Sequence, residues 1–302
     1  NQTVRALWAG EEGECAVYPL GVYYDVKRAV VEIPLRVRET VKTDPLAAYD
    51  NALEPGGADF KRFFSWFRNQ EDLENEKRLD DQNYQDSVLS AVREAVEHFT
   101  GLSKLRVRRS PMRMTLKKGG EELTVQQLSD GEQCYLALVG DLARRLALLN
   151  QHASHPLQGP GLVIIDEVEL HLHPDWQRQI IPKLQATFPN CQLVLSTHSP
   201  QVLSHVHSED VWILSQREGE IVAEQPDLTY GVDSSLLLQT VLGVEERNPD
   251  VKKELDDLFA RIDDGNLQAA RTKLRKLRQE YGGLPTLSRA DAILTRKERV
   301  GQ

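Results

Sequence analysis

The chain has 302 residues, which is long enough for about two domains and too long for a disulfide-stapled mini-protein. Its 46 Asp and Glu residues outnumber its 37 Lys and Arg residues, and the resulting formal net charge of −9 argues against a generally basic nucleic-acid binder. Any contact with DNA must therefore come from a local patch.

Cysteine use and hydropathy predict a cytoplasmic protein. Cys15, Cys134 and Cys191 are an odd number without paired zinc-ligand spacing, and two of them sit in apolar runs, which predicts reduced, buried thiols. No apolar stretch is long enough to cross a bilayer and no signal-peptide pattern is present. We therefore expect no membrane insertion.

The first part of the chain changes character twice. Residues 1–58 mix short apolar runs, such as 29–33, with turn formers, which predicts strands and connections. Residues 59–103 carry aromatic residues and valines at helical spacing, which predicts a lateral lobe of two helices. Apolar and basic residues then alternate over 104–118, as expected of a pair of strands.

Residues 104–230 hold the most legible segments. Leu136–Leu149 is apolar nearly all round and predicts a buried helix. Leu162–Ile165 and Cys191–Thr197 are runs rich in β-branched and aliphatic residues, as buried parallel strands require, and a helix begins between them near Pro174. A right-handed crossover lays these strands side by side, or one strand apart, with their carboxyl ends at one edge, where open α/β sheets bind ligands.

The last part of the chain is predicted to be a hairpin followed by helices. Two short apolar runs joined through Glu218-Gly219 predict the hairpin. After Gly231 the periodicity is helical, and we expect residues 231–302 to form a helical partner-binding region. The predicted helices span residues 236–242, 251–262, 267–281 and 290–299.

Asp166 and Glu167 directly follow the first aliphatic strand. A carboxylate at a strand end can hold Mg²⁺, and a second one can position or deprotonate the water that attacks a γ-phosphate. An acidic loop after an apolar strand is also a common structural pattern. The pair by itself leaves both interpretations open.

His198 follows the second strand, in Ser196-Thr197-His198-Ser199-Pro200. An imidazole at this edge can donate a hydrogen bond to a γ-phosphate oxygen, and hydrogen bonds to charged groups contribute about 1.5–3 kcal/mol each. The alternative is a strand-end histidine stabilised by the turn that Pro200 begins. Its position relative to Asp166-Glu167 favours the functional interpretation.

The run Leu128-Ser129-Asp130-Gly131-Glu132 precedes the buried helix. Ser129 and Glu132 have the spacing of a capping box, which is a sufficient structural reason for both. The same helix start presents free N–H groups and a positive dipole end, and Ser129 with Gly131 lets a phosphate approach closely. The two interpretations are compatible.

Together these segments resemble the ABC-type ATPases. Leu128–Glu132 resembles their signature motif, Leu162–Glu167 their Walker B strand, Val168–Pro174 their D-loop and His198 their switch histidine. The D-loop and Ser196–Pro200 are most similar to the RecF and overcoming-lysogenization-defect branch. The resemblance implies an α/β fold, with an ABC-type ATPase sheet of parallel core strands, a helical lateral lobe and a helical C-terminal region.

Three further segments carry a second resemblance. They are Tyr23-Tyr24 with Arg28, Phe63–Phe67 with Glu71–Glu76, and the tail from Arg289-Ala290 to Arg296-Lys297-Glu298. These segments resemble the anti-phage ATPases of the Septu kind (PtuA), which are also found beside retrons. The resemblance implies an ATPase that uses ATP and Mg²⁺ and that regulates or carries an HNH-type nuclease in a defence complex. It adds a retron reverse transcriptase and its DNA or RNA to the expected partners.

The resemblance also implies a head-to-tail dimer, in which ATP bound to one copy is closed over by the signature helix of the other. Residue roles follow from the matched motifs. They are Glu167 and His198 as catalytic residues, Asp166 as metal ligand, Ser129, Asp130, Gly131 and Glu132 as nucleotide-binding residues, and Glu169, His171 and His173 as D-loop residues at the dimer.

Two departures from the family pattern qualify these expectations. No G-x-x-x-x-G-K-[ST] phosphate loop occurs, and because this loop precedes the other motifs in the family, we expect it before Asn1. The metal-binding nuclease domain of the overcoming-lysogenization-defect proteins also has no match. We therefore expect nuclease activity to belong to a partner.

Two weaker patterns leave alternatives open. Lys104, Arg106, Arg108 and Arg109 begin a basic stretch that suits either contact with a DNA backbone or a solvated strand face. His171 and His173 are spaced like metal ligands but lack an identifiable third, which favours a loop at the dimer.

Two other functions fit part of the pattern. A DNA-repair or chromosome-maintenance ATPase would normally show long coiled-coil heptads, and residues 59–99 are too short for them. An assembly scaffold with slow or lost hydrolysis would be favoured by an upstream sequence without a phosphate loop.

Overall fold

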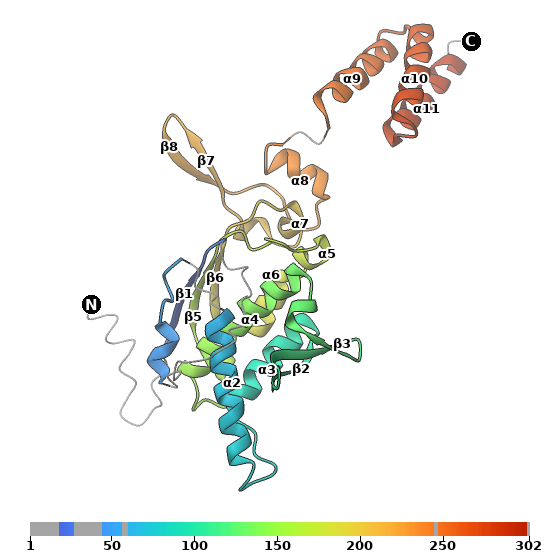
Figure 1. Ribbon diagram of the computed structural model, residues 1–302. Helices are drawn as coiled ribbons and strands as arrows, with labels where there is room; N and C mark the ends of the chain where they lie inside the picture. Colours follow the sequence, from blue (N-terminus) through green and yellow to red (C-terminus); the bar gives the residue numbers. More distant parts are fainter. Residues whose placement is uncertain (1–17, 27–43, 56–59, 245–246, 301–302) are drawn as a thin grey trace. The chain divides into compact units, whose positions relative to one another are not determined.

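The computed structural model describes residues 18–26, 44–55, 60–244 and 247–300 (Figure 1). The chain divides into two compact units, Asn1–Val232 and Asp233–Gln302. The expected strand at 29–33 and the thiol of Cys15 lie outside the described residues.

A parallel three-stranded sheet lies at the centre of the first unit. Its strand order is β1 (Leu20–Tyr24), β5 (Gly161–Ile165) and β6 (Cys191–Leu195), and all neighbours are parallel. Tyr24 pairs with Ile165, and Ile165 pairs with Leu195, so the three strands end together. This confirms the expected α/β fold with parallel core strands, because β5 and β6 are side by side with their carboxyl ends at one edge.

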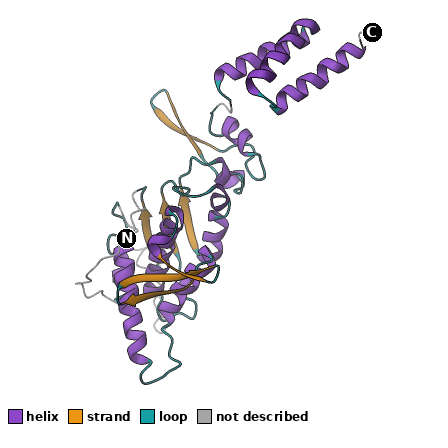
Figure 2. Ribbon diagram, turned by 45° about the vertical axis from the view of Figure 1, so that its right-hand side comes forward, coloured by secondary structure: helices purple, strands orange, loops and turns teal. Residues whose placement is uncertain are grey.

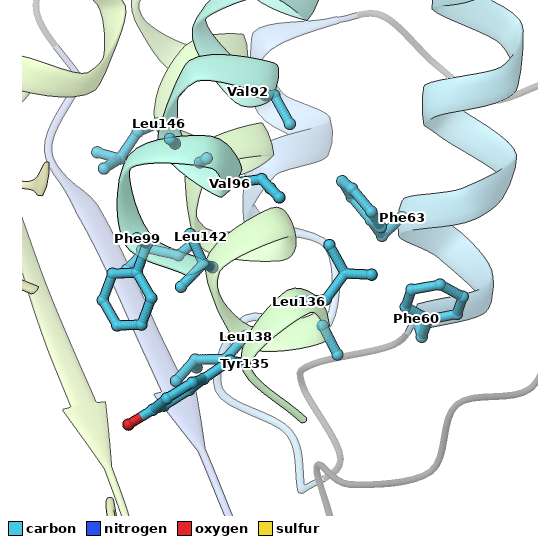
Figure 3. Packing of buried hydrophobic residues seen from close by; sticks show 14 of the residues in the cluster. Phe60, Phe63, Val92, Val96, Phe99, Tyr135, Leu136, Leu138, Leu142 and Leu146 are labelled. Atoms are coloured by element: carbon cyan, nitrogen blue, oxygen red, sulfur yellow. The ribbon is translucent and has the colours of Figure 1, made fainter. Parts of the chain in front are cut away.

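Three helices pack against one another beside this sheet. The helices α2 (Phe60–Lys77) and α3 (Ser87–Thr100) lie where two helices were expected, and they share one core with α4 (Asp130–Leu149), which is buried along most of its length. Gly140 of α4 is required where α2 crosses it, since a Cβ there would lie 2.7 Å from the Phe63 ring. Figure 3 shows side chains that these three helices contribute to the core, among them Phe60, Phe63, Val92, Val96, Phe99, Leu136 and Leu142.

The basic stretch 104–118 forms the expected pair of antiparallel strands, and a short strand that we had not expected follows it and completes a three-stranded sheet. The three strands are β2 (Ser103–Arg109), β3 (Met112–Lys118) and β4 (Glu121–Thr124). The short β4 lacks the alternation that marks a strand, and it is held by pairing with β3, Lys118 opposite Glu121. Pairing partners decide such a strand, because β-propensity depends strongly on context.

One face of the parallel sheet is less covered than we expected of buried strands. Val163 and Ile165 are buried on the side of the main core, whereas Leu162 and Val194 on the other face are 40% and 47% exposed. Successive side chains on a strand point to opposite faces. The aliphatic residues of β5 and β6 therefore give the sheet two apolar faces, and the described core covers one of them.

Short elements and a hairpin complete the first unit. The strands β7 (Ile213–Arg217) and β8 (Glu220–Glu224) form the expected hairpin, whose turn places Glu218 and Gly219 at positive φ. The short helices are η1 (Pro45–Tyr49), η2 (Val125–Gln127), η3 (Pro156–Gln158), α5 (Pro174–Gln177), α6 (Ile180–Thr187), α7 (Pro200–Leu203) and η4 (Ser208–Asp210).

The second unit is helical, as expected (Figure 2). Its helices α9, α10 and α11 enclose a separate small core of leucine, isoleucine and alanine side chains. No described helix in either unit is long and apolar enough to cross a membrane. The elements are α8 (Ser234–Thr240), α9 (Pro249–Asp263), α10 (Leu267–Tyr281) and α11 (Pro285–Val300).

Candidate functional site

At the carboxyl edge of the parallel sheet, Asp166 is hydrogen-bonded to Ser196, the residue that directly follows β6. The Ser196 hydroxyl donates a hydrogen bond to Asp166 Oδ1 and accepts one from the Glu167 N–H at 2.8 Å. The Ser196 carbonyl also accepts from the Val168 N–H at 3.0 Å. Ser196 therefore holds the backbone of Glu167 and Val168 immediately after β5. The sequence analysis had assigned no role to Ser196.

Glu167 and His171 have positive φ angles of 44° and 64°. Non-glycine residues rarely adopt this left-handed conformation, which is found preferentially at functional sites and is held there by the surrounding structure. For Glu167 the holding contact is the hydrogen bond to Ser196. The backbone at the expected catalytic residue is thus set by the neighbouring strand.

Glu169 connects the loop after β5 to the loop after β6. Its Oε1 accepts a hydrogen bond from the His198 N–H at 2.6 Å. Its Oε2 is buried and has no hydrogen-bond partner among the described residues. Asp166, Glu167, Glu169 and His198 thus belong to one pair of adjoining loops, and the His198 side chain is exposed.

Tyr23 and Asp25, at the end of β1, also lie at this edge. Loss of solvation and the neighbouring Asp166 carboxylate raise the pKa of the Tyr23 phenol, and Asp25 adds to the effect. Tyr23 had been noted only as part of a resemblance. No local pattern marked it as a neighbour of Asp166, since the two are 143 positions apart.

Ser129 caps α4 in the expected capping box. The Ser129 N–H and hydroxyl donate to Glu132 Oε2 at 3.1 and 3.0 Å, and the Glu132 N–H donates back to the hydroxyl at 3.4 Å. Both side chains are thus engaged within the helix start. A phosphate bound here would have to share or replace the bond between the Ser129 hydroxyl and Glu132.

Glu132 has a second, distant partner in Lys118 at the end of β3, with an N–O distance of 2.7 Å. Burial favours the protonated carboxyl group, but the bonds from Lys118 and Ser129 outweigh it and hold the pKa of Glu132 below its usual value. The contact ties the sheet β2–β3–β4 to the helix start. Sequence reasoning identified the box and missed this ion pair.

A hollow of about 390 Å³ lies where the start of α4 meets the loop after β5. Trp176 at its rim stacks on Tyr135 of α4, with ring centroids 4.9 Å apart. The edge residues Asp166, Glu167, Glu169 and His198 are not among its described lining residues. Its lining residues are Lys118, Gln127, Ser129, Asp130, Gly131, Glu132, His171, Leu172, His173 and Trp176.

Gly131 is a point of close packing against this loop. A Cβ at Gly131 would lie 2.7 Å from the His171 carbonyl oxygen, which is closer than real Cβ atoms approach. The close packing of Gly131 against the loop is therefore a structural reason for glycine at this position. The close approach of a phosphate, which the sequence suggested, stays a prediction.

We expect Gly131→Ala to lower the free energy of unfolding by about 1–2 kcal/mol, because the added methyl group overpacks the loop at His171. Urea denaturation followed by tryptophan fluorescence measures this. Gly21→Ala is the matched control, since a Cβ at Gly21 has no heavy atom within 4 Å. Equal stability of the two variants would argue against the close contact.

The site residues therefore fall into two groups joined by the loop Val168–His173. One group gathers Asp166, Glu167, Glu169 and His198 at the sheet edge. The other gathers Ser129–Glu132 with His171 and His173 around the hollow. His173 also accepts a hydrogen bond from the Asp175 N–H at 3.3 Å and caps α5.

Most of the basic stretch on β2 has acidic partners. Arg106 and Arg108 bond to Glu122 of β4, each at 2.9 Å. Arg109 bonds to Glu71 of α2 at 2.9 Å, and Lys104 is exposed. A DNA backbone at this sheet would have to exchange these ion pairs, and the contact remains a prediction.

The donor set at the sheet edge fits a magnesium nucleotide. Mg²⁺ is usually bound through one or two carboxylates together with substrate phosphates and water, so a full cage of protein ligands is not required. Asp166 offers such a carboxylate, oriented by the Ser196 hydroxyl. Among the described residues no group of three or more His, Cys, Asp or Glu side chains could hold a metal ion by itself.

Fold and site together define an α/β protein whose polar residues gather at the carboxyl edge of a parallel sheet beside a capped, buried helix. Residues 42–204 match the family described as "AAA domain, putative AbiEii toxin, Type IV TA system", and the chain belongs to this family.

Two of its relatives are named as retron ATPases. The chain is 33% identical to the "Retron Ec83 probable ATPase" of Escherichia coli, over 78% of this chain and 54% of that protein. It is 34% identical to the "Retron Vc95 probable ATPase" of Vibrio cholerae serotype O1 biovar El Tor, over 66% and 48%. The chain thus spans about half the length of these relatives.

Two further similarities are more distant. The "Septu protein PtuA" of Bacillus mycoides (strain KBAB4) is 29% identical over 45% of this chain and 19% of that protein. Among solved structures, the SMC head domain from Thermotoga maritima superposes with a TM-score of 0.36 at 17% identity, covering 51% of this chain and 52% of that one.

Proposed function

We propose that this chain is part of an ATPase of an anti-phage defence system and carries its hydrolytic carboxylates and its signature helix. The observation that carries the proposal is the Ser196 bridge to Asp166 and to the backbone of Glu167 at one edge of the parallel sheet, beside which Glu169 binds the His198 N–H. The names of the retron and Septu relatives support the defence setting.

Each edge residue has a chemical role in this proposal. Asp166 holds Mg²⁺, which when bound neutralises charge on the phosphates. Glu167 orients the attacking water and accepts its proton, and a well-placed general base contributes about 10²–10⁴ in rate. His198 donates a hydrogen bond to a γ-phosphate oxygen. The Glu169 carboxylate positions His198 by accepting a hydrogen bond from the backbone N–H of His198.

The hollow around Ser129–Glu132 serves a different step, the closure of a head-to-tail dimer. The start of α4 offers N–H groups and a positive dipole end to phosphate oxygens. In the proposed dimer, the signature residues Ser129, Asp130, Gly131 and Glu132 close over ATP held by a second copy, and His171 and His173 lie at the interface. ATP shifts the population only through its higher affinity for the closed dimer.

The proposed partners follow from the defence setting. The ATPase regulates or carries an HNH-type nuclease subunit, and in a retron context it also meets the reverse transcriptase and its DNA or RNA. The helical unit after Val232 is the proposed partner-binding region. A cytoplasmic location is part of this proposal.

The dimer step is tested by light scattering of the protein made from its complete gene, with and without ATP and Mg²⁺. In the slowly hydrolysing Glu167→Gln background, ATP is expected to double the mass. Ser129→Arg in the same background is expected to abolish this doubling, because the side chain fills the hollow at the helix start. ATP-dependent doubling that survives Ser129→Arg would refute closure by the signature helix.

A further inference from the structure

The helices α10 and α11 carry a net positive charge, whereas the chain as a whole is acidic. Residues 267–300 hold nine Lys and Arg side chains and three Asp and Glu side chains, in a protein whose formal net charge is −9. Charge of one sign concentrated on a short segment creates a local potential that attracts oppositely charged partners. The segment therefore differs in electrostatic character from the chain as a whole.

Ion pairs consume only part of this charge. Arg271 bonds to Asp291 and to Glu298, and Arg278 shares Asp291 at 2.8 Å. Both carboxylates of α11 are thus occupied by arginines of α10, and these bonds hold the pKa values of Asp291 and Glu298 below the usual range. The negative charges of Asp291 and Glu298 are thus offset by arginines, which reduces their repulsion of a bound anion.

Two exposed arginines of α11, Arg296 and Arg299, form no ion pair with any described residue. With Arg278 they line a hollow of about 610 Å³, which the Ser288 hydroxyl also lines. Arg275 lies on the same face of α10 as Arg271 and Arg278, because positions four and three residues apart share one side of a helix. The other lining residues are Ser288, Asp291, Ala292 and Thr295.

We propose that this arginine-lined hollow of α10 and α11 binds the phosphate backbone of a nucleic acid. Guanidinium groups present N–H donors in a planar fork that matches phosphate oxygens. The three arginines Arg278, Arg296 and Arg299 would follow successive phosphates, and the exposed Ser288 hydroxyl would offer a further donor.

The alternative occupant is an acidic protein segment, and the surface of these helices argues against it. Protein interfaces are anchored by buried aromatic or aliphatic side chains at their centre. Among the described residues 247–299, no large hydrophobic side chain is exposed. Interfaces with nucleic acids are more polar and more positively charged, which is the character of this hollow.

The proposal goes beyond the proposed ATPase function and does not depend on it. The hollow belongs entirely to the second unit, and the carboxylate edge and the signature helix belong to the first. Binding is therefore measured without ATP and Mg²⁺, so that loss of hydrolysis and loss of nucleic-acid binding are separate results.

The test is fluorescence anisotropy of the full chain with labelled single-stranded DNA, duplex DNA and single-stranded RNA of about 20 nucleotides, at several salt concentrations. The test variant is Arg296→Gln/Arg299→Gln. The control Lys252→Gln/Lys253→Gln removes the same charge from exposed positions of α9. Circular dichroism checks folding, and Arg296 and Arg299 make no ion pair within the described part of the chain whose loss would destabilise the unit.

We expect the test variant to bind on the order of 10-fold more weakly near 0.1 M salt and to lower the slope of log Kd against log salt by about 1–2. The control should bind like the unmodified chain. Equal binding by all three proteins, or equal loss in both variants, would overturn the proposal. The proposal would also be overturned if the unmodified chain bound labelled poly-glutamate but no oligonucleotide, and if Arg296→Gln/Arg299→Gln lost the poly-glutamate binding. The hollow would then suit an acidic protein.

Discussion

Replacing Glu167 by Gln is expected to lower steady-state ATP turnover by a factor of about 10²–10⁴ and to leave ATP binding unchanged. Gln preserves the shape of the side chain and removes the group that accepts a proton from water. The backbone of residue 167 is held independently of this side chain, because its N–H donates to Ser196. The variant thus separates the chemistry of the carboxylate from its placement.

The measurement is phosphate release by the protein made from its complete gene, with nucleotide affinity determined in parallel. Glu209→Gln is the matched control, an exposed acidic residue on η4 that is expected to leave both quantities unchanged. Unchanged phosphate release in Glu167→Gln would show that this carboxylate is not the general base. A parallel loss of ATP affinity would instead give Glu167 a role in binding.

The second large effect is expected at Asp141, a buried carboxylate in the middle of α4. It accepts hydrogen bonds from Arg145 at 2.7 Å, from Arg144 at 2.6 Å and from the Tyr24 hydroxyl at 3.1 Å. Arg145 is 1% exposed and also donates to the carbonyl oxygens of Ala48 and Asp50. The network joins the centre of α4 to the end of β1.

We expect Asp141→Asn to lower the free energy of unfolding by about 3–5 kcal/mol, because it leaves two buried guanidinium groups without a counter-charge. Urea denaturation measures the loss. Tryptophan fluorescence reports this unit alone, since all four tryptophans precede residue 233. Glu224→Gln, which breaks an exposed ion pair to Arg217, is the control and should change stability little.

The same pair predicts a pH dependence of stability. Burial opposes ionisation of Asp141, but Arg145 and Arg144 outweigh it and hold its pKa below the usual value. A carboxyl group with a lowered folded-state pKa contributes stability that is complete above the ordinary value of about 4 and is lost as the pH falls below it. The stability difference between the original chain and Asp141→Asn should therefore shrink below about pH 4. A difference that stays constant down to pH 3 would contradict this assignment.

Several elements were predictable because their determinants lie within a few residues of one another. The capping box of Ser129 and Glu132 spans four positions, and the turn at Glu218-Gly219 joins two strands that are adjacent in the chain. Helical periodicity placed α10 at its observed bounds. The handedness of a strand-helix-strand connection predicted that β5 and β6 are parallel and end at one edge, side by side or one strand apart, and the structure shows them side by side.

Other features could not be predicted because the sequence does not show which distant groups meet. The strand β4 exists through its pairing with β3, and the arginines of β2 find their acids on β4 and α2. A run of basic residues has the same sequence pattern whether the side chains contact solvent, nucleic acid or a neighbouring carboxylate. Only the tertiary structure distinguishes these cases.

The sequence by itself determined the residue types of the candidate site and the order in which they follow the strands, because a strand end and a helix cap are local events. The tertiary structure alone decided how these residues are held. Ser196 bridges Asp166 and Glu167, Glu169 holds the N–H of His198, and Gly131 receives the carbonyl of His171. Each of these contacts joins groups about 30 or 40 positions apart, and their geometry depends on the packing of whole elements.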